Sequence, residues 1–502
     1  MPNMWRTPNR WSRSSTAVPI VCVVIAVSRS LVAHRLLSVL LAANHRCGGR
    51  SSAASPLRRC APDIPTGAGH SLIAPVASPH RFRHPRVPFA ASRRCSLILD
   101  VRMTMTQLVT GSTAKVLLTA ERDQPRYDGH LWVFDTNVAE VLGTPAPGDL
   151  VDVYTHRKRL LGRGLFNPHS KIRVRLLTFQ EELVDEAFFA ARLRAAATLR
   201  RMVTPHANAC RLVHGESDLL PGLVVDRFAD VAVMQALGYG MDVRKDVFGD
   251  LLIQEAGVKT VYLRNDAKSR ALEGLPLSKG FLRGEGPTRV QIHEGKAQFT
   301  VDFAEGQKTG WFCDQRENRL AAAVYAKGKR VLEAFCHTGA FGVQAALAGA
   351  QSVEGLDVSA AAVALAQAHA EQNHVAAICD YRQADAFDEL RVLERNQQRY
   401  DLVILDPPAF ARSKKAAPHA LAGYKDVNLR GLRLLQAGGV LVSCSCSQPV
   451  SDEDFWKMLQ SAARDANRQI RLLEQRGQGP DHPVLAGMPE TRYLKCFIVQ
   501  VL

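Results

Sequence analysis

The feature that most constrains the fold of this 502-residue chain is an alternation of short apolar strands and helical segments toward its carboxyl end. Residues 330–335, RVLEAF, predict a strand that runs directly into a glycine turn at Gly339, followed by a helix over about 341–350. A second strand over 352–356 ends at Asp357. Strands that alternate with helices pair in parallel, so this pattern predicts an α/β fold.

Acidic residues at the ends of these strands predict a nucleoside-binding edge. Ligands collect at the carboxyl ends of parallel strands. Gly339 would let the backbone approach a ligand closely, and the carboxylate of Asp357, 18 residues later, suits two ribose hydroxyls. A third strand over 381–385 ends in Asp385, where an adenine contact is expected. The glycine turn matches GxGxxG poorly, so the pattern favours S-adenosylmethionine over a dinucleotide.

A fourth strand is expected over 401–406, within the sequence DLVILDPPAF. Two prolines could simply end a strand, but their place at the predicted ligand edge favours a functional role. Asp406 could bind the exocyclic amine or ring nitrogen of a flipped base. Pro407, Pro408 and Phe410 are the expected walls of that base pocket.

Residues 442–448, VSCSCSQ, predict a fifth strand with Cys444 and Cys446 on one face. Small residues at a crowded strand end would explain this pattern without chemistry, because free cysteine is often buried. The strand nevertheless ends in the same crevice as Asp406. Cytosine C5 is a poor nucleophile, and its methylation requires a thiolate to add to C6 first. The position therefore favours a catalytic role for at least one cysteine.

The basic charge of the chain is concentrated in residues 1–102. This segment holds 15 arginines, no lysine and two acids, or +13 of the total +16, which leaves 49 basic and 46 acidic residues, a net +3, in the remainder. Three interpretations are open: a transit or signal peptide, a disordered basic arm, or residues translated from an upstream start. The abrupt change in composition favours Met103 or Met105 as the working start.

Membrane and metal chemistry are not expected. The apolar run 17–27 is interrupted by Arg29 and Arg35 before it could span a bilayer. The cysteines after residue 102 form no CxxC pair and show no zinc spacing. A reduced, cytoplasmic protein is therefore predicted.

Two smaller domains are expected before the catalytic part. Residues 106–179 contain short apolar runs separated by turn residues, which predict a small β-barrel, and residues 180–288 predict an α+β domain. Lys171, Arg173 and Arg175 alternate on one predicted strand, either as a solvated face or as an RNA-binding patch. Residues 289–502 form the predicted catalytic domain.

From about Leu117 to Leu502, the chain resembles the bacterial 23S rRNA cytosine-C5 methyltransferases of the RlmI type. Most of the motifs are weak singly but specific together: Leu131-Trp132-Val133-Phe134, Phe166-Asn167-Pro168, Gly215-Glu216-Ser217-Asp218 with Leu220-Pro221-Gly222, Lys308-Thr309-Gly310 with Asp314-Gln315-Arg316, Thr338-Gly339 with Phe341, Asp406-Pro407-Pro408, Gly423-Tyr424-Lys425-Asp426, Ser445-Cys446-Ser447, Asp481-His482-Pro483-Val484 and Tyr493-Leu494-Lys495.

The resemblance implies three parts: a PUA-like RNA-binding barrel, a central α+β domain, and a Rossmann-like class I methyltransferase domain with a mostly parallel seven-stranded sheet. It makes Cys446 the thiolate and Cys444 a packing residue. S-adenosylmethionine would be the cofactor. The expected partner is ribosomal RNA, either 23S rRNA or an assembling large subunit, and self-association as a homodimer is left open. The expected cofactor residues are Asp314, Arg316, Phe335, Thr338, Gly339, Asp357, Asp385 and Asp406.

Two departures from that family concern its ligands. Ala409 stands where the family often has a lysine, and the glycine loop reads His337-Thr338-Gly339-Ala340 instead of YTGG. The alanine at position 409 leaves open which contacts hold the target nucleobase, and with them the identity of the target nucleotide. The segment 307–316 is expected to close over the site, although a plain linker would also fit.

Two other activities are compatible with the sequence. DPPAF is one residue away from a DPPF-like signature, so methylation of an exocyclic amine is one alternative, and it would make Cys446 dispensable. A non-catalytic RNA-binding or ribosome-assembly factor that retains the fold is the other. A small-molecule substrate is disfavoured, because two added domains would serve it poorly.

Overall fold

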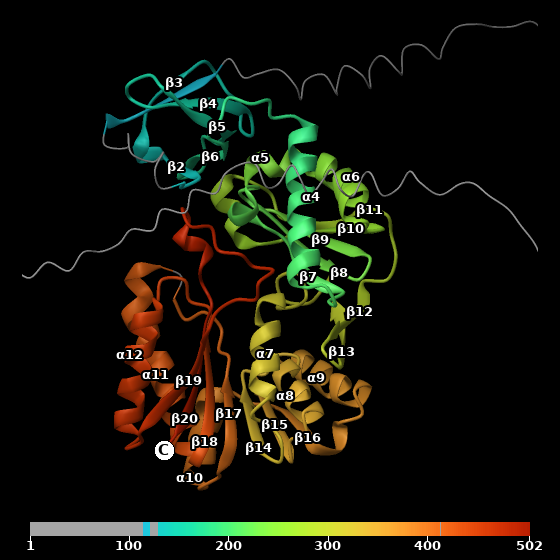
Figure 1. Cartoon of the computed structure of the whole chain (residues 1–502), viewed down its shortest axis with the longest axis vertical. Coiled ribbons are helices and arrows are strands. Elements are labelled where there is room, and N and C mark those ends of the chain that lie inside the picture. Colours follow the sequence, from blue (N-terminus) through green and yellow to red (C-terminus); the bar gives the residue numbers. More distant parts are fainter. Residues whose placement is uncertain (1–113, 121–128, 412) are drawn as a thin grey trace, which may run out of the picture. The chain divides into compact units, whose positions relative to one another are not determined.

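Figure 1 shows a computed structural model of the chain, which describes residues 114–120, 129–411 and 413–502. The chain divides into two units, Met1–Ala90 and Ala91–Leu502, and all described residues belong to the second. The predicted extension 1–102 lies outside the described residues. Among the described helices, none has the length and apolar character needed to cross a bilayer.

The first part of unit two is a mixed six-stranded sheet. Its order is β2-β6-β5-β4-β1-β3, with β1 and β4 parallel. The strands are β1 (Lys115–Leu118), β2 (Trp132–Phe134), β3 (Val138–Leu142), β4 (Leu150–Tyr154), β5 (Leu160–Phe166) and β6 (Ile172–Thr178). Alternate residues of these strands, such as Val151, Val153 and Val174, are fully buried in one apolar core.

The second part is a five-stranded sheet in the order β11-β10-β9-β8-β7, accompanied by helices. Its elements are α4 (Glu186–Val203), β7 (Ala209–His214), β8 (Leu223–Phe228), β9 (Val231–Ala236), α5 (Tyr239–Asp242), α6 (Lys245–Ala256), β10 (Thr260–Asn265) and β11 (Ser278–Arg283). The α4 helix begins where the side chain of Asp185 accepts a hydrogen bond from the backbone N–H of Phe188. The expected α+β composition is thus observed.

The last part is a seven-stranded sheet preceded by the hairpin of β12 (Arg289–Glu294) and β13 (Ala297–Asp302). Its order is β16-β15-β14-β17-β18-β20-β19, in which β14 to β18 are parallel and β20 pairs antiparallel with both of its neighbours. The strands are β14 (Arg330–Ala334), β15 (Ser352–Asp357), β16 (Cys379–Gln383), β17 (Tyr400–Leu405), β18 (Leu435–Ser445), β19 (Ile470–Arg476) and β20 (Lys495–Val501).

Helices pack against both faces of this sheet (Figure 1). On one face, Val331 and Ile404 pack with residues of α8 (Ala340–Leu347) and α9 (Ala360–Gln372). On the other, Leu332 and Leu405 pack with α10 (Ala386–Arg395), α11 (Ala417–Leu434) and α12 (Asp452–Asp465). Neighbouring strand residues point to opposite faces, which explains the nearly continuous apolar strand sequences. The predicted α/β class, with a mostly parallel seven-stranded sheet, is confirmed.

Two predicted strand ends differ from the structure. The third strand ends at Gln383, and Asp385 caps α10 by accepting a hydrogen bond from the backbone N–H of Phe387 at 2.8 Å. The fifth strand ends at Ser445, so Cys446 lies just beyond it. In both cases the chain leaves the sheet earlier than its sequence pattern indicates, and the functional candidate stands in the following loop.

Candidate active site

A cavity of about 610 Å³ opens at the carboxyl ends of β14, β15, β17 and β18. Six of the residues expected at the cofactor line it: Asp314, Phe335, Thr338, Asp357, Asp385 and Asp406. Pro407, Pro408 and Cys446 line it as well. The parallel sheet therefore gathers residues that are far apart in sequence at one edge.

The loop after β14 adopts an uncommon backbone conformation. Phe335, His337 and Gly339 have φ angles of 63°, 50° and 72°, in the left-handed region. A Cβ atom at Gly339 would come within 2.7 Å of the Tyr381 ring, and the Tyr381 hydroxyl donates a hydrogen bond to the Gly339 carbonyl at 3.1 Å. Gly339 is therefore required by its φ angle and by its close approach to Tyr381 on β16, and it does not itself line the cavity.

Two carboxylates hold this loop in place. Asp357 accepts hydrogen bonds from the backbone N–H groups of His337 and Ser359, at 2.8 and 2.9 Å. Glu333, on β14, accepts from the backbone N–H groups of Phe341 and Gly342 at 3.2 and 2.9 Å. Burial raises the pKa of Glu333 to about 8. Sequence reasoning missed Glu333, whose signal is a single acid inside the apolar strand RVLEAF.

Asp406 is partly exposed to the cavity and forms no direct ion pair within the part of the chain that the structure describes. Its Oδ1 accepts a hydrogen bond from Gln315 Nε2 at 2.9 Å. Burial, followed by the nearby charge of Asp314, raises the pKa of Asp406 to about 7, and the opposing charges of Arg319 and Lys308 do not cancel this effect. The carboxyl group therefore titrates close to neutral pH, in the range where a general acid or base works best.

The two candidate cysteines have different surroundings. Cys444 is fully buried and lies opposite Cys496 in the register of β18 and β20. Cys446 is partly exposed and lines the cavity. Burial and the charge of Asp406 raise the pKa of Cys446 to about 11, with Lys308 acting in the opposite direction. A thiol in this setting needs a positive charge or a proton acceptor before it can act as a nucleophile.

The segment 307–316 forms one wall of the cavity. Gln307, Lys308 and Trp311 line it, and Lys308 has a φ of 54°. The Thr309 hydroxyl donates a hydrogen bond to Asp226, a β8 residue of the five-stranded sheet, at 2.6 Å. The Lys308 ammonium lies 4.7 Å from the centre of the Phe312 ring. The wall of the cavity is thus anchored to the preceding domain.

Arg316 does not line the cavity. Its guanidinium donates a hydrogen bond to the carbonyl of Ala209 at 3.1 Å and lies 3.4 Å from an oxygen of Asp481. Its side chain is only 5% exposed. These contacts make Arg316 part of the connection to β7, whereas Asp314, two residues earlier, lines the cavity.

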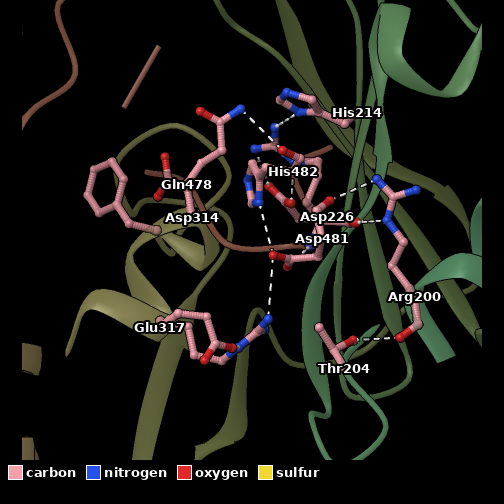
Figure 2. Close-up of polar contacts among 12 residues, drawn as sticks. Arg200, Thr204, His214, Asp226, Asp314, Glu317, Gln478, Asp481 and His482 are labelled. Atoms are coloured by element: carbon pink, nitrogen blue, oxygen red, sulfur yellow. Dashed lines mark hydrogen bonds and ion pairs between the residues drawn. The ribbon is translucent and has the colours of Figure 1, made fainter. Parts of the chain in front are cut away.

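A cluster of buried charges joins the five-stranded sheet to the catalytic domain (Figure 2). Arg200 pairs with Asp218 at 2.5 Å, and Arg211 pairs with Asp226 at 2.6 Å. The backbone carbonyl of Asp481 accepts from Arg200 at 2.8 Å, and its carboxylate accepts from the backbone N–H of Arg211 at 2.9 Å. We call these five residues the junction cluster.

Phe410 lies behind the cavity. Its ring centre is 4.5 Å from that of Tyr424 and 5.7 Å from that of Phe387, and only Phe387 lines the cavity. The Tyr424 hydroxyl lies 2.8 Å from the Ser447 hydroxyl, close to the end of β18. Phe410 therefore packs between Tyr424 and Phe387 and does not line the cavity, whereas Phe387 is a cavity residue that the sequence did not single out.

The three basic residues expected on one strand of the first domain have different surroundings. Lys171 is exposed, and Arg173 donates hydrogen bonds to the carbonyls of Asn167 and Pro168. Arg175 forms an ion pair with Glu273 at 2.6 Å, and both side chains are mostly buried. The charge of Arg175 is thus neutralised within the protein.

The donors and acceptors of the cavity fit S-adenosylmethionine. Asp357 and Asp385 offer carboxylate acceptors for ribose and amine donors, and Phe335 and Phe387 offer apolar ring surface for adenine. A volume of about 610 Å³ is in the range of small-molecule sites. Within the described ranges, no group of three or more His, Cys, Asp or Glu side chains could hold a metal ion.

Comparisons with known proteins agree with this geometry. Residues 116–179 match the PUA-like domain family, and residues 276–494 match the S-adenosylmethionine-dependent methyltransferase family. A ribosomal RNA large subunit methyltransferase I from Shewanella denitrificans is 39% identical over 397 residues, covering 77% of this chain and 99% of the relative. The protein of the same name from Alteromonas mediterranea is 39% identical over 393 residues, covering 78% and 99%.

Solved structures show the same fold. A putative S-adenosylmethionine-dependent methyltransferase from Streptococcus mutans is 22% identical and aligns with a TM-score of 0.66, over 77% of this chain and all of the other. A putative methyltransferase complexed with SAH aligns with a TM-score of 0.67 at the same identity and coverage. The chain therefore belongs to the ribosomal RNA large subunit methyltransferase I family, and its cofactor is S-adenosylmethionine.

Proposed function

We propose that this enzyme forms 5-methylcytidine in 23S ribosomal RNA through a covalent bond between Cys446 and cytosine C6. The observation that carries the proposal is the presence of Cys446 and Asp406 in one cavity with most of the expected cofactor residues, whereas Cys444 is fully buried. The names of the relatives, ribosomal RNA large subunit methyltransferase I, support the substrate class.

The first chemical step is the addition of a thiolate. S-adenosylmethionine, when bound, supplies an electrophilic methyl group. Cys446 adds to C6, which turns C5 into a nucleophilic enamine carbon. Asp406 titrates near neutral pH, so its protonated form donates a hydrogen bond to N3 and favours the addition. Lys308 opposes the high pKa of the thiol.

Access to C5 requires the cytosine to leave its stack, and Pro407 and Pro408 form part of the pocket that would receive it. The PUA-like domain, which we take as residues 106–179, would hold structured RNA by phosphate and shape contacts, with Lys171 on its exposed surface. Residues 180–288 and 289–502 would then form the central and catalytic domains.

Two further properties follow as proposals. The seven cysteines that the structure describes are free thiols, which suits a cytoplasmic location. Self-association as a homodimer stays a prediction, and analytical ultracentrifugation of the full chain would test it.

Transfer of label to RNA tests the proposed function. The full chain is incubated with tritiated S-adenosylmethionine and ribosomal RNA that lacks modifications, and the labelled nucleoside is identified by mass spectrometry. We expect label in 5-methylcytidine, lost in Cys446→Ala and kept in Cys444→Ala. Label in an amine-methylated nucleoside, or label that survives Cys446→Ala, would contradict the proposal. Absence of label from every unmodified large-subunit RNA would favour a binding factor.

A further inference from the structure

Asp314 is a buried carboxylate with one oxygen left without a partner. It lies between Cys313 and Gln315 in a short 3-10 turn, lines the cavity, and is 6% exposed. Its Oδ2 accepts a hydrogen bond from the Tyr493 hydroxyl at 2.5 Å. Its Oδ1 is buried and accepts no hydrogen bond. A buried acceptor without a donor is costly, so this oxygen marks a place where a group of the substrate is expected.

Asp314 shares the cavity with both proposed catalytic groups. Its negative charge raises the pKa of Cys446 and that of Asp406. The next residue, Gln315, donates the hydrogen bond that holds the Asp406 carboxyl group at 2.9 Å. The Asp314 carboxylate is therefore close enough to interact electrostatically with the Cys446 thiol and with Asp406, the group proposed to bind the cytosine edge.

The surroundings of Asp314 keep it ionised. Burial acts to raise its pKa, but the charges of His482, Lys308 and Arg211, together with the Tyr493 hydrogen bond, hold that pKa below its usual value. Figure 2 shows Asp314 with His482 among the residues around the junction cluster. An ionised carboxylate accepts protons and donates none, so the unpartnered Oδ1 is a proton acceptor.

Other carboxylates of the cavity are less suited to accept a proton there. Glu333 has both oxygens engaged by backbone N–H groups, and its raised pKa leaves it largely protonated at neutral pH. Asp357 likewise accepts a backbone hydrogen bond at each oxygen. Asp406 is the group proposed to bind the ring edge, and Asp385 caps α10 by accepting hydrogen bonds from backbone N–H groups.

We propose that Asp314 is the base that removes the C5 proton after methyl transfer, an inference that rests on the proposed function. Because the methyl group adds to C5 while the original hydrogen is still bound there, that hydrogen must leave as a proton before aromaticity returns. Oδ1 of Asp314 takes the proton, the C5–H electron pair forms the C5=C6 double bond, and the bond between C6 and the Cys446 sulfur breaks. The thiolate recovers a proton from Asp314 or water, which restores the enzyme.

This role makes a prediction that a cofactor ligand would not share. If only the base is lost, methyl transfer still takes place once, but elimination fails and the methylated RNA stays attached to Cys446. In Asp314→Asn we expect turnover to fall by about 10²-fold or more. We also expect a tritium-labelled protein–RNA complex to survive a denaturing gel, and Asp314→Asn/Cys446→Ala to form none.

The experiment uses the full chain, unmodified ribosomal RNA and tritiated S-adenosylmethionine, with equilibrium binding of S-adenosylmethionine as the measure of an intact site. Asp314→Glu keeps a carboxylate and should recover part of the turnover without accumulating the complex. A second readout is RNA carrying [5-³H]cytidine: wild type releases tritium to water, and Asp314→Asn methylates without releasing it.

Several results would overturn the proposal. Asp314→Asn could bind S-adenosylmethionine normally and form no complex, or it could turn over within threefold of wild type. It could instead lose S-adenosylmethionine binding together with Asp314→Glu, which would make Asp314 a cofactor or structural residue. Failure of the proposed function has a different signature, because wild type itself would then leave no label in 5-methylcytidine.

Discussion

The cavity and the junction cluster both contain carboxylates, but only those of the junction cluster form direct ion pairs with arginine. Asp218 and Asp226 each lie within 2.6 Å of an arginine nitrogen. In the cavity, the hydrogen bond to Asp406 comes from the neutral amide of Gln315, and one oxygen of Asp314 has no partner. Burial therefore raises the pKa of Asp406 to about 7.

The difference separates two uses of buried charge. A buried carboxylate that is paired with a cation costs the folded protein little free energy as long as the partner remains. Removal of either member of the pair lowers the stability strongly. A carboxylate whose pKa is raised by burial, such as Asp406, destabilises the fold when it is ionised, and it persists where it is needed for chemistry. We infer that the junction cluster maintains the arrangement of domains and that the cavity groups carry the reaction.

The largest expected effect concerns the two cysteines. Cys446→Ala removes the proposed nucleophile and should lower methyl transfer by at least about 10³-fold. Cys444→Ala, the matched control, removes a packed thiol and should keep methyl transfer within about threefold while lowering stability by about 1 kcal/mol. Initial rates with tritiated S-adenosylmethionine measure methyl transfer by both variants, and urea denaturation measures their stability. Equal loss of activity in both variants would contradict the distinction.

The junction should respond in stability. Arg200→Ala leaves Asp218 buried without its cation, so the free energy of unfolding should fall by about 3–5 kcal/mol. The control is Arg194, which lies on the same helix and forms an exposed ion pair with Glu255. Arg194→Ala should change stability by less than about 1 kcal/mol in urea denaturation. Similar losses of unfolding free energy in the two variants would contradict a particular contribution of the junction cluster to stability.

The pH dependence of kcat/KM tests the protonation states in the cavity. The reaction needs a thiolate at Cys446, with a pKa of about 11, and a protonated Asp406, with a pKa of about 7. Below pH 7 the fraction of Cys446 present as thiolate rises tenfold per pH unit while Asp406 stays protonated. Above pH 7 the protonated fraction of Asp406 falls tenfold per pH unit, which cancels the further rise in thiolate. We expect kcat/KM to rise and then level near pH 7. A continued tenfold rise per unit above pH 7 would show that Asp406 is not required in its protonated form.

A smaller effect concerns stability as a function of pH. Folding raises the pKa of Asp406 from 3.8 to about 7, so the folded state keeps a proton that the unfolded chain releases. The stability of the wild type therefore falls as pH rises from about 4 to 7, and the full cost is present above pH 7. Asp406→Asn removes this cost and should gain on the order of 1 kcal/mol at pH 8, since part of the group faces the cavity, and little at pH 4. Thermal unfolding at both pH values provides the measurement.

Much of the fold could be predicted because it follows from local periodicity. The strand that ends in Asp357 and the strand that precedes Asp406 are apolar segments between turns, and the structure has them at 352–357 and 400–405. The sequence pattern predicts Asp385 at a strand end, but Asp385 caps α10 because its carboxylate accepts a hydrogen bond from the backbone N–H of Phe387. Helix capping and strand ends use the same residue types, so the sequence alone does not separate them.

The roles of site residues were harder to predict where they depend on contacts with residues far away in the sequence. Arg175 is neutralised by Glu273, 98 residues away, and Arg316 is held near Asp481, so neither role is visible in the local sequence. Cys444 and Cys446 have the same local pattern, and only the position of Cys496 on β20 and the end of β18 distinguish them. Residue type and order can be read locally, whereas pairing is a property of the folded chain.

One paired measurement tests the central claim most directly: methyl-transfer rate and unfolding free energy for Asp406→Asn and Asp218→Asn, side by side at pH 8. We predict that Asp406→Asn loses at least about 10²-fold in rate while being as stable as wild type or more so. We predict that Asp218→Asn unfolds more easily by about 1–3 kcal/mol and keeps its rate within about threefold. An Asp406→Asn enzyme that retains its rate, or an equally stable Asp218→Asn enzyme that loses it, would contradict the account.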